Sequence, residues 1–205
     1  MIDLYLAATA NGLRAAVGLS ECGLEYRSHK IDLMKGEQKT PEFLKLNPAA
    51  QIPVMVDHEG PNGKEITLAQ SGAIILYAAE KTGQFLPQDL ERRAKVLQWF
   101  MQGATDVSPT SGAIFQLEMM APEKNEAITN HFKKRLLNFF ALCDAHLANR
   151  EFLADEISIA DFMLYPNYFA RKALIDAAGS YTNLHRWGAT MGARPAVRKG
   201  MNPFG

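Results

Sequence analysis

The sequence changes character once, at a short linker, and this change constrains the fold more than any other feature. The first eighty or so residues alternate between short apolar runs and amphipathic stretches, which predicts strands and helices in turn. After a linker over residues 83–90, which contains Gly83 and Pro87, only helical patterns follow. With 205 residues, 47% of them apolar, the chain can fill two modest cores. We therefore predict an α/β domain over residues 1–83 and an all-helical domain over residues 90–205.

The first domain is predicted to follow the order βαβ and then ββα. Strands are expected at residues 2–6, 26–31, 53–57 and 65–68. A turn is expected at residues 7–12, and helices at residues 13–24, 41–46 and 71–82. The run Gly60-Pro61-Asn62-Gly63 is a strong turn signal that joins the last two strands as a hairpin. This order is that of a thioredoxin-like domain.

The second half contains one explicit helix start and one clear apolar stripe. Ser158-Ile159-Ala160-Asp161 predicts a capping box, in which the side chains of Ser158 and Asp161 accept each other's free backbone amides. A second long helix is expected to start with Ala94, Leu97, Gln98 and Met101, and to pack antiparallel to the helix that carries the stripe. The stripe consists of Phe132, Leu136, Phe139, Phe140 and Cys143.

Charge and cysteine content exclude several classes of protein. Twenty-two basic residues balance 22 acidic ones, whereas a nucleic-acid binder normally carries a basic surplus. The two cysteines, Cys22 and Cys143, do not have the spacing of a metal site, and a secreted scaffold would use more. The start lacks the pattern of a signal peptide, and no apolar run reaches the roughly 18 residues of a membrane span. We expect a soluble, cytoplasmic protein that binds neither nucleic acid nor membrane.

Four short motifs resemble, in this order, those of cytosolic glutathione transferases. They are Thr9-Ala10-Asn11, Asn47-Pro48-Ala49-Ala50-Gln51-Ile52-Pro53, Gln70-Ser71-Gly72-Ala73-Ile74 and Ser158-Ile159-Ala160-Asp161. Each motif is weak alone, but together they cover nearly the whole chain in the expected order. The Thr-x-Asn turn is similar to that of the bacterial nu class, which is related to yeast prion-like nitrogen regulators. Gln70 departs from the Glu often found there in that class.

The resemblance implies an enzyme with glutathione as co-substrate and neither metal nor nucleotide. The enzyme would activate the thiol of glutathione to reduce a disulfide or peroxide, or to attack an electrophile held by the helical domain. Nu-class proteins typically act as glutathione-dependent disulfide reductases. The implied partners are a small disulfide or electrophilic substrate and a second copy of the chain in a homodimer. Two alternatives remain: a non-catalytic glutathione-binding interaction module, and a zeta-type isomerase, whose Ser-Ser-Cys stretch is missing here.

Thr9 and Asn11 are the candidate catalytic residues, because a hydroxyl and an amide can donate hydrogen bonds to a thiolate. A free thiol has a pKa of about 8.5, so only a few per cent is ionised at neutral pH. A helix N-terminus at this position adds partial positive charge. Residue 10 is Ala rather than Cys, so the reacting sulfur must be that of glutathione. Taken alone, Thr and Asn before a helix are more often capping residues.

The resemblance assigns the rest of glutathione to further side chains and peptide groups. The Ser71 hydroxyl suits a carboxylate, Gln70 the γ-glutamyl ammonium, and Gln38 the glycyl end. In the resembling family the Ile52-Pro53 bond is cis and the Ile52 peptide groups pair with the tripeptide, whereas the residues alone favour a trans bond. Capping of a helix is the alternative interpretation of Gln70 and Ser71. The predicted binding residues are Asn11, Gln38, Ile52, Pro53, Gln70 and Ser71.

Overall fold

The computed structural model describes all 205 residues and divides them into two compact units. The first unit comprises residues 1–85 and 193–205, and the second comprises residues 86–192. The break near residue 85 falls in the predicted linker, but the last helix groups with the first unit rather than with the helical segment that precedes it. None of the helices has both the length and the apolar character needed to cross a membrane.

The first unit is built on one four-stranded sheet, in the order β2-β1-β3-β4. The strands are β1 (Ile2–Leu6), β2 (Tyr26–Lys30), β3 (Val54–Asp57) and β4 (Ile66–Ala69). β1 pairs in parallel with β2 and antiparallel with β3, and β3 and β4 form the predicted hairpin. In β1 the side chains of Ile2, Leu4 and Leu6 are buried, whereas the alternating Asp3 and Tyr5 are partly exposed. The predicted thioredoxin-like order of elements is confirmed.

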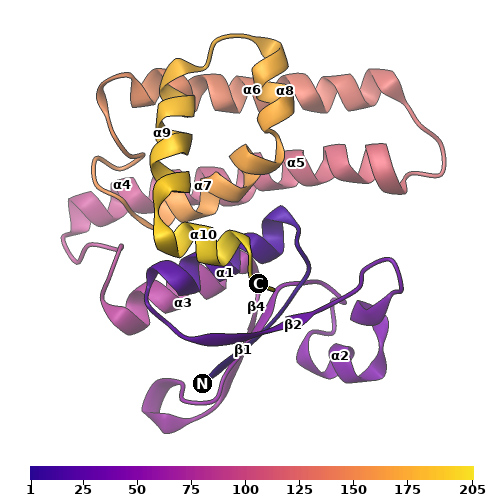
Figure 1. The fold of residues 1–205 in the computed structure, drawn as a ribbon, viewed down its shortest axis with the longest axis vertical. Helices are drawn as coiled ribbons and strands as arrows, with labels where there is room; N and C mark the ends of the chain where they lie inside the picture. Colours follow the sequence, from indigo (N-terminus) through magenta and orange to yellow (C-terminus); the bar gives the residue numbers. More distant parts are fainter. The chain divides into compact units, whose positions relative to one another are not determined.

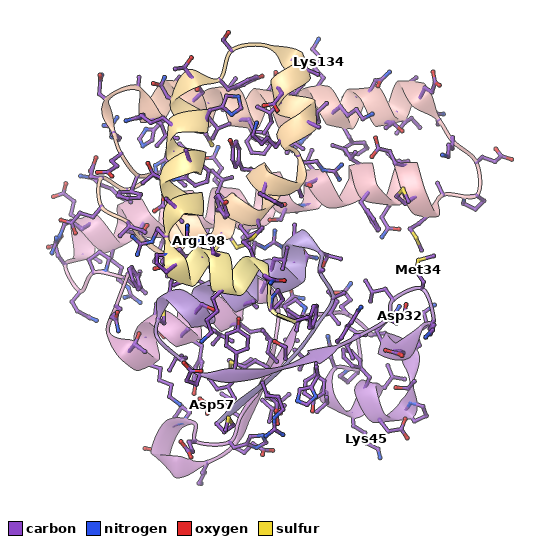
Figure 2. The ribbon with its side chains drawn as sticks, in the orientation of Figure 1. Asp32, Met34, Lys45, Asp57, Lys134 and Arg198 are labelled. Atoms are coloured by element: carbon purple, nitrogen blue, oxygen red, sulfur yellow. The ribbon has the colours of Figure 1, made fainter.

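The two ends of the sheet carry different residues, as Figure 2 shows. Asp57, the last residue of β3, pairs with Ile2 at the start of β1. Asp32 and Met34 follow β2 at the opposite end, where β1 also ends. The helices of the unit are α1 (Ala10–Glu21), α2 (Pro41–Leu46), α3 (Ser71–Thr82) and α10 (Pro195–Met201), with short 3₁₀ turns η1 (Glu37–Lys39) and η2 (Pro61–Gly63).

Helix α1 begins at Ala10 rather than at the predicted Leu13. Thr9 has an extended backbone, and its hydroxyl oxygen accepts a hydrogen bond from the Gly12 amide at 3.4 Å, which makes Thr9 the N-cap. The predicted turn over residues 7–12 is therefore wrong in its second half. Asn11 lies in the first turn of a helix, where backbone amides have no partner within the helix.

Helix α10 packs against α1 and belongs to the first unit (Figure 1). The Arg194 guanidinium donates two hydrogen bonds of 2.7 Å to the carboxylate of Glu21. Gly200 allows the backbones to come close, since a Cβ at this position would lie 2.5 Å from the Cα of Val17. Helical periodicity shows that residues 195–201 form a helix, but it does not show which element that helix covers.

The second unit contains helices throughout, as the sequence predicts. They are α4 (Leu90–Met101), α5 (Ser108–Phe115), α6 (Glu126–His146), α7 (Ile159–Ala170), α8 (Lys172–Ala178) and α9 (Thr182–Ala193), with π-helical turns η3 (Gln102–Val107) and η4 (Gln116–Met120) and the 3₁₀ turn η5 (Leu147–Asn149). In α6 the predicted stripe buries Leu136, Phe140 and Cys143. In α4 the buried residues are Val96 and Phe100.

The predicted capping box opens α7. The Ser158 amide donates to Asp161 Oδ2 at 3.0 Å, and the Ser158 hydroxyl oxygen accepts from the Ala160 amide at 3.3 Å. The fully buried Asp161 carboxylate also accepts from Trp187 Nε1 at 2.8 Å and from the Leu153 amide at 3.1 Å. Asp161 therefore joins the start of α7 to α9 and to the preceding loop, beyond its capping role.

We expect Gly200→Ala to destabilise the protein, because the added Cβ would meet the α1 backbone at 2.5–2.8 Å. Overpacking of this kind costs about 1–3 kcal/mol of the free energy of unfolding, which a urea titration measures. The matched control is Gly112→Ala in α5, where no atom lies within 4 Å of the new Cβ. The control should be neutral or stabilise by up to about 1 kcal/mol. Equal effects of the two substitutions would contradict the close packing of α10 on α1.

Candidate functional site

Two helix N-termini of the first unit carry four of the predicted site residues. Thr9 caps α1 and Asn11 is exposed in its first turn, while Gln70 precedes α3 and Ser71 opens it. α1 and α3 pack against each other. Each N-terminus presents free backbone amides and partial positive charge, which favour bound anions. The geometry therefore suits a ligand with negative charges at two places.

Thr9 combines the two interpretations that its sequence position allows. Its oxygen accepts the Gly12 amide, as expected of a capping residue. A hydroxyl that accepts one hydrogen bond keeps its own proton to donate. Capping therefore leaves the Thr9 proton available to a ligand at the start of α1.

Arg14, which the sequence analysis did not single out, links the two N-termini. Its Nη2 donates to Asn11 Oδ1, and its Nε donates to Ser71 Oγ at 3.2 Å. The residue is 3% exposed, and burial lowers the pKa of its guanidinium to about 10, which leaves it protonated at neutral pH. A single charge within an apolar helix stripe is the sequence signal that could have revealed it, because a buried charge needs polar partners.

Arg14 also fixes which groups of its two partners can donate. A guanidinium only donates, so the Asn11 atom that faces it is the carbonyl oxygen, and the Asn11 NH₂ group is directed elsewhere. Likewise Ser71 uses its oxygen as an acceptor toward Arg14, and its hydroxyl proton is directed away. The two side chains thereby become oriented donors.

Gln70 has an unusual backbone conformation for a residue other than glycine, with φ 74° and ψ 115°. Its side chain is exposed and makes no capping hydrogen bond to α3, so the capping interpretation of Gln70 is wrong. A positive φ at such a residue costs about 1–3 kcal/mol and is found most often where a ligand is held. The conformation directs the chain into Ser71 at the start of α3.

The Ile52-Pro53 peptide bond is cis, as the resemblance implies and against the expectation from the residues alone. It lies directly before β3, and no hydrogen bond within the protein uses the Ile52 amide or carbonyl. Ile52 is only half-buried, so these two backbone groups are free to bind a ligand. They can pair with an extended peptide in the manner of an added strand.

Gln38 lies in η1, in the loop that precedes α2. Its Oε1 is buried and has no hydrogen-bond partner, and it is the only side-chain atom of the protein in that condition. Leaving a buried polar atom unpaired costs about 1–3 kcal/mol. A ligand that reaches η1 would satisfy this atom.

The protein has no thiolate or tyrosinate of its own at the site. Burial raises the pKa of the Cys22 thiol to about 11 and that of the Cys143 thiol to about 12. Tyr5 stacks on His29 at 4.5 Å on the sheet, and desolvation raises the pKa of its hydroxyl. A sulfur nucleophile at this site must therefore come from a ligand.

Known proteins resemble this chain over almost its whole length. The disulfide-bond oxidoreductase YfcG of Escherichia coli is 37% identical across 96% of this chain and 93% of its own. The model of the glutathione S-transferase N-terminal domain matches residues 2–80. This chain belongs to the glutathione transferase family. YghU, a second disulfide-bond oxidoreductase of E. coli, is 35% identical to this glutathione transferase across 97% of this chain and 73% of its own.

Solved structures of glutathione transferases also resemble this chain over nearly its whole length. A Pseudomonas putida glutathione transferase with one glutathione disulfide bound per subunit has a TM-score of 0.90 and 31% identity, covering 100% of this glutathione transferase and 92% of that chain. A Burkholderia graminis glutathione transferase with two glutathione molecules bound per subunit has a TM-score of 0.89 and 32% identity, covering 98% of this chain and 87% of that one.

We expect Gln70→Gly to stabilise this glutathione transferase by about 1 kcal/mol. Glycine adopts a positive φ without strain, and this gain exceeds its larger loss of chain entropy on folding. Gln70→Ala keeps the strain and serves as the control, since it removes the same exposed side chain. Urea titration of the three proteins measures the difference. Equal stability of the Gly and Ala variants would show that the Gln70 backbone is unstrained.

Proposed function

We propose that this glutathione transferase holds the glutathione thiolate with Asn11 and Thr9 and uses it to reduce disulfides. The observation that carries the proposal is the orientation of Asn11. Its carbonyl faces the buried Arg14, so its amide is left to donate at the N-terminus of α1. A donor, a capping hydroxyl and a helix terminus at one place all favour the anionic form of a bound thiol.

The remaining predicted residues suit the rest of glutathione. Ser71 and the first-turn amides of α3 would bind the γ-glutamyl carboxylate, and Gln70 its ammonium group. The unpaired Ile52 peptide groups would pair with the tripeptide backbone. The buried, unpartnered Oε1 of Gln38 would accept a hydrogen bond from the peptide N–H of the glycyl residue.

The reaction balances with two molecules of glutathione and one disulfide. The first thiolate attacks one sulfur of the substrate, so that a mixed disulfide forms and a substrate thiolate leaves. The second glutathione thiolate attacks the glutathione sulfur of the mixed disulfide, which releases the other substrate thiolate. Glutathione is oxidised to its disulfide, and the two protons lost by glutathione go to the two substrate thiols.

The names and contents of the relatives support reduction over conjugation. YfcG and YghU are disulfide-bond oxidoreductases. The Pseudomonas protein holds the oxidised product of such a reaction, and the Burkholderia protein holds two glutathione molecules, as many as the reaction consumes. The buried, protonated cysteines agree with a mechanism in which no protein thiol takes part.

The proposal extends to partners and location. The substrate is a small disulfide, with peroxides and electrophiles as further acceptors for the same thiolate. We propose a homodimer in the cytoplasm, which sedimentation and cell fractionation would test. The helical segment from residue 90 would contribute the acceptor pocket.

The proposal predicts that Asn11→Ala lowers glutathione-dependent reduction of 2-hydroxyethyl disulfide about 10- to 100-fold in kcat/KM. A hydrogen bond to a charged group contributes about 1.5–3 kcal/mol, and this one would form only with the thiolate. Thr9→Ala should lower the rate by less, because the amides of α1 remain. Chlorodinitrobenzene conjugation, assayed in parallel, measures the competing activity.

The control is Asn138→Ala, an exposed asparagine of α6 that should leave both rates unchanged. Conjugation without disulfide reduction would replace the proposed activity with that of an ordinary transferase. If glutathione binds but both rates stay at background, the protein is a glutathione-binding module and the proposal is wrong.

A further inference from the structure

Arg14 bridges the two ends of the proposed glutathione site. One guanidinium contacts Asn11 at the start of α1 and Ser71 at the start of α3, through two different nitrogen atoms. Lysine could not make both contacts in this way, because its single ammonium lacks the fixed fork of a guanidinium. Arg14 and Ser71 lie 57 positions apart in the sequence, and Arg14 itself is almost completely buried.

We propose that Arg14 is a positioning residue, an inference that rests on the proposed function. Arg14 directs the Asn11 amide at the glutathione sulfur, and it directs the Ser71 hydroxyl at the γ-glutamyl carboxylate. Without Arg14, the Asn11 side chain can rotate by half a turn and present its oxygen, an acceptor that repels a thiolate. Ser71 would likewise be free to direct its proton to another acceptor. The fixed positive charge also favours both anions of the ligand.

The test compares wild type with Arg14→Lys and Arg14→Gln by two readouts. Ultraviolet absorbance of the bound thiolate against pH gives the pKa of the glutathione thiol, and calorimetry gives its Kd. We expect both variants to raise the thiol pKa, and kcat/KM for disulfide reduction to fall roughly 10- to 100-fold. The Arg14 variants should lose less affinity for S-methylglutathione, which has no thiolate, than for glutathione.

Asn11→Asp provides a variant that does not remove the buried charge. The new carboxylate can still accept from Arg14, so the variant should keep the fold. A carboxylate cannot donate to a thiolate, so the pKa of the bound glutathione thiol should rise. Arg14→Gln in an Asn11→Ala background should change the thiol pKa less than it does in wild type. If the Arg14 variants leave the thiol pKa unchanged while Asn11→Ala raises it, Arg14 is only structural and the proposed function stands. If Asn11→Ala has no effect either, the proposed function itself fails.

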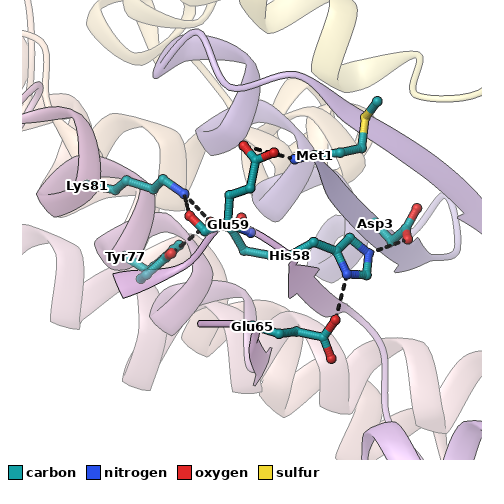
Figure 3. A network of polar contacts seen from close by, with 8 residues as sticks. Met1, Asp3, His58, Glu59, Glu65, Tyr77 and Lys81 are labelled. Carbon is teal, nitrogen blue, oxygen red and sulfur yellow. Dashed lines mark hydrogen bonds and ion pairs between the residues drawn. The ribbon is translucent and has the colours of Figure 1, made fainter. Parts of the chain in front are cut away.

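A separate cluster of charges lies at the other end of the sheet, where β1 begins (Figure 3). His58 follows β3, and its Nε2 lies 2.8 Å from Asp3 Oδ2, while its Nδ1 lies 2.6 Å from Glu65 Oε2. The second oxygen of Asp3 lies 2.7 Å from His29 Nε2 on β2. The cluster therefore connects β1, β2 and both sides of the β3–β4 hairpin.

Other charged groups surround this cluster. The positive charge of Arg27 on β2 helps to lower the pKa of Asp3. The amino group of Met1 lies 3.4 Å from the Glu59 carboxylate. Lys81 of α3 pairs with Asp57, which also accepts from the Tyr77 hydroxyl at 2.7 Å. None of these groups forms a hydrogen bond with the His58 ring, whose two nitrogens face the carboxylates of Glu65 and Asp3.

Both ring nitrogens of His58 face carboxylate oxygens, and only the doubly protonated ring can donate to both. We infer that the His58 imidazolium is a proton-dependent clamp that holds the β3–β4 hairpin to the start of β1. When the ring loses its proton, one nitrogen turns a lone pair toward a carboxylate and that contact becomes repulsive. The clamp then releases one side of the hairpin.

The direction of the pH dependence follows from the two partners. Hydrogen bonds to Asp3 and Glu65 raise the pKa of His58, so its stabilising effect is complete below about pH 6.5 and is lost as the pH rises through the raised value. Hydrogen bonds from His29 and His58 lower the pKa of Asp3, whose stabilising effect is lost as the pH falls below about 4. The clamp is therefore strongest between these limits.

Amide hydrogen exchange of residues 54–69 on the acid and alkaline sides of pH 7, corrected for intrinsic rates, tests the clamp. We expect wild type to lose protection in the hairpin as the pH rises, and His58→Gln to show low protection that does not change. His131→Gln, which removes an exposed histidine of α6, should behave as wild type. The same loss of protection in His58→Gln as in wild type, or an ordinary His58 pKa by NMR, would overturn the inference.

Discussion

The buried guanidinium of Arg14 makes the two hydrogen bonds that hold the candidate site together. A charge in an apolar interior is tolerated only when polar groups surround it, and Arg14 finds two of them at the N-termini of α1 and α3. The same contacts leave Asn11 and Ser71 as donors that point away from the charge. A requirement of folding, to satisfy a buried cation, thus produces a pair of oriented hydrogen-bond donors at a place already favourable to anions.

Helix α1 holds this arrangement because it is packed on several sides. β1 leads into it through the Thr9 cap, α3 packs along it, and α10 returns from the end of the chain to cover it. The ion pair of Arg194 with Glu21 and the close approach at Gly200 fix α10 in place. The C-terminal helix therefore supports the element that carries Thr9 and Asn11 of the candidate site.

The sheet separates two kinds of polar chemistry. At the end of β1, Gln38 Oε1 and the Ile52 peptide groups have no hydrogen-bond partner within the protein. The Gln70 backbone at the same end has a strained, positive φ. At the start of β1 the carboxylates and histidines satisfy one another, so that end has a structural role. Unpaired groups at one end and paired groups at the other mark where a peptide such as glutathione would bind.

The sequence by itself determined the order of elements, the hairpin, the capping box at Ser158 and the motifs that indicate glutathione, because these depend on local patterns. It also located the residues that the proposal uses, from Thr9 to Ser71. Only the tertiary structure decided the cis bond before Pro53, the early start of α1 and the partner of the last helix. It alone revealed Arg14, since the contact between α1 and α3 that gives this residue its role joins positions far apart in the chain. Local periodicity describes the face of a helix, but which distant group satisfies a buried charge depends on packing.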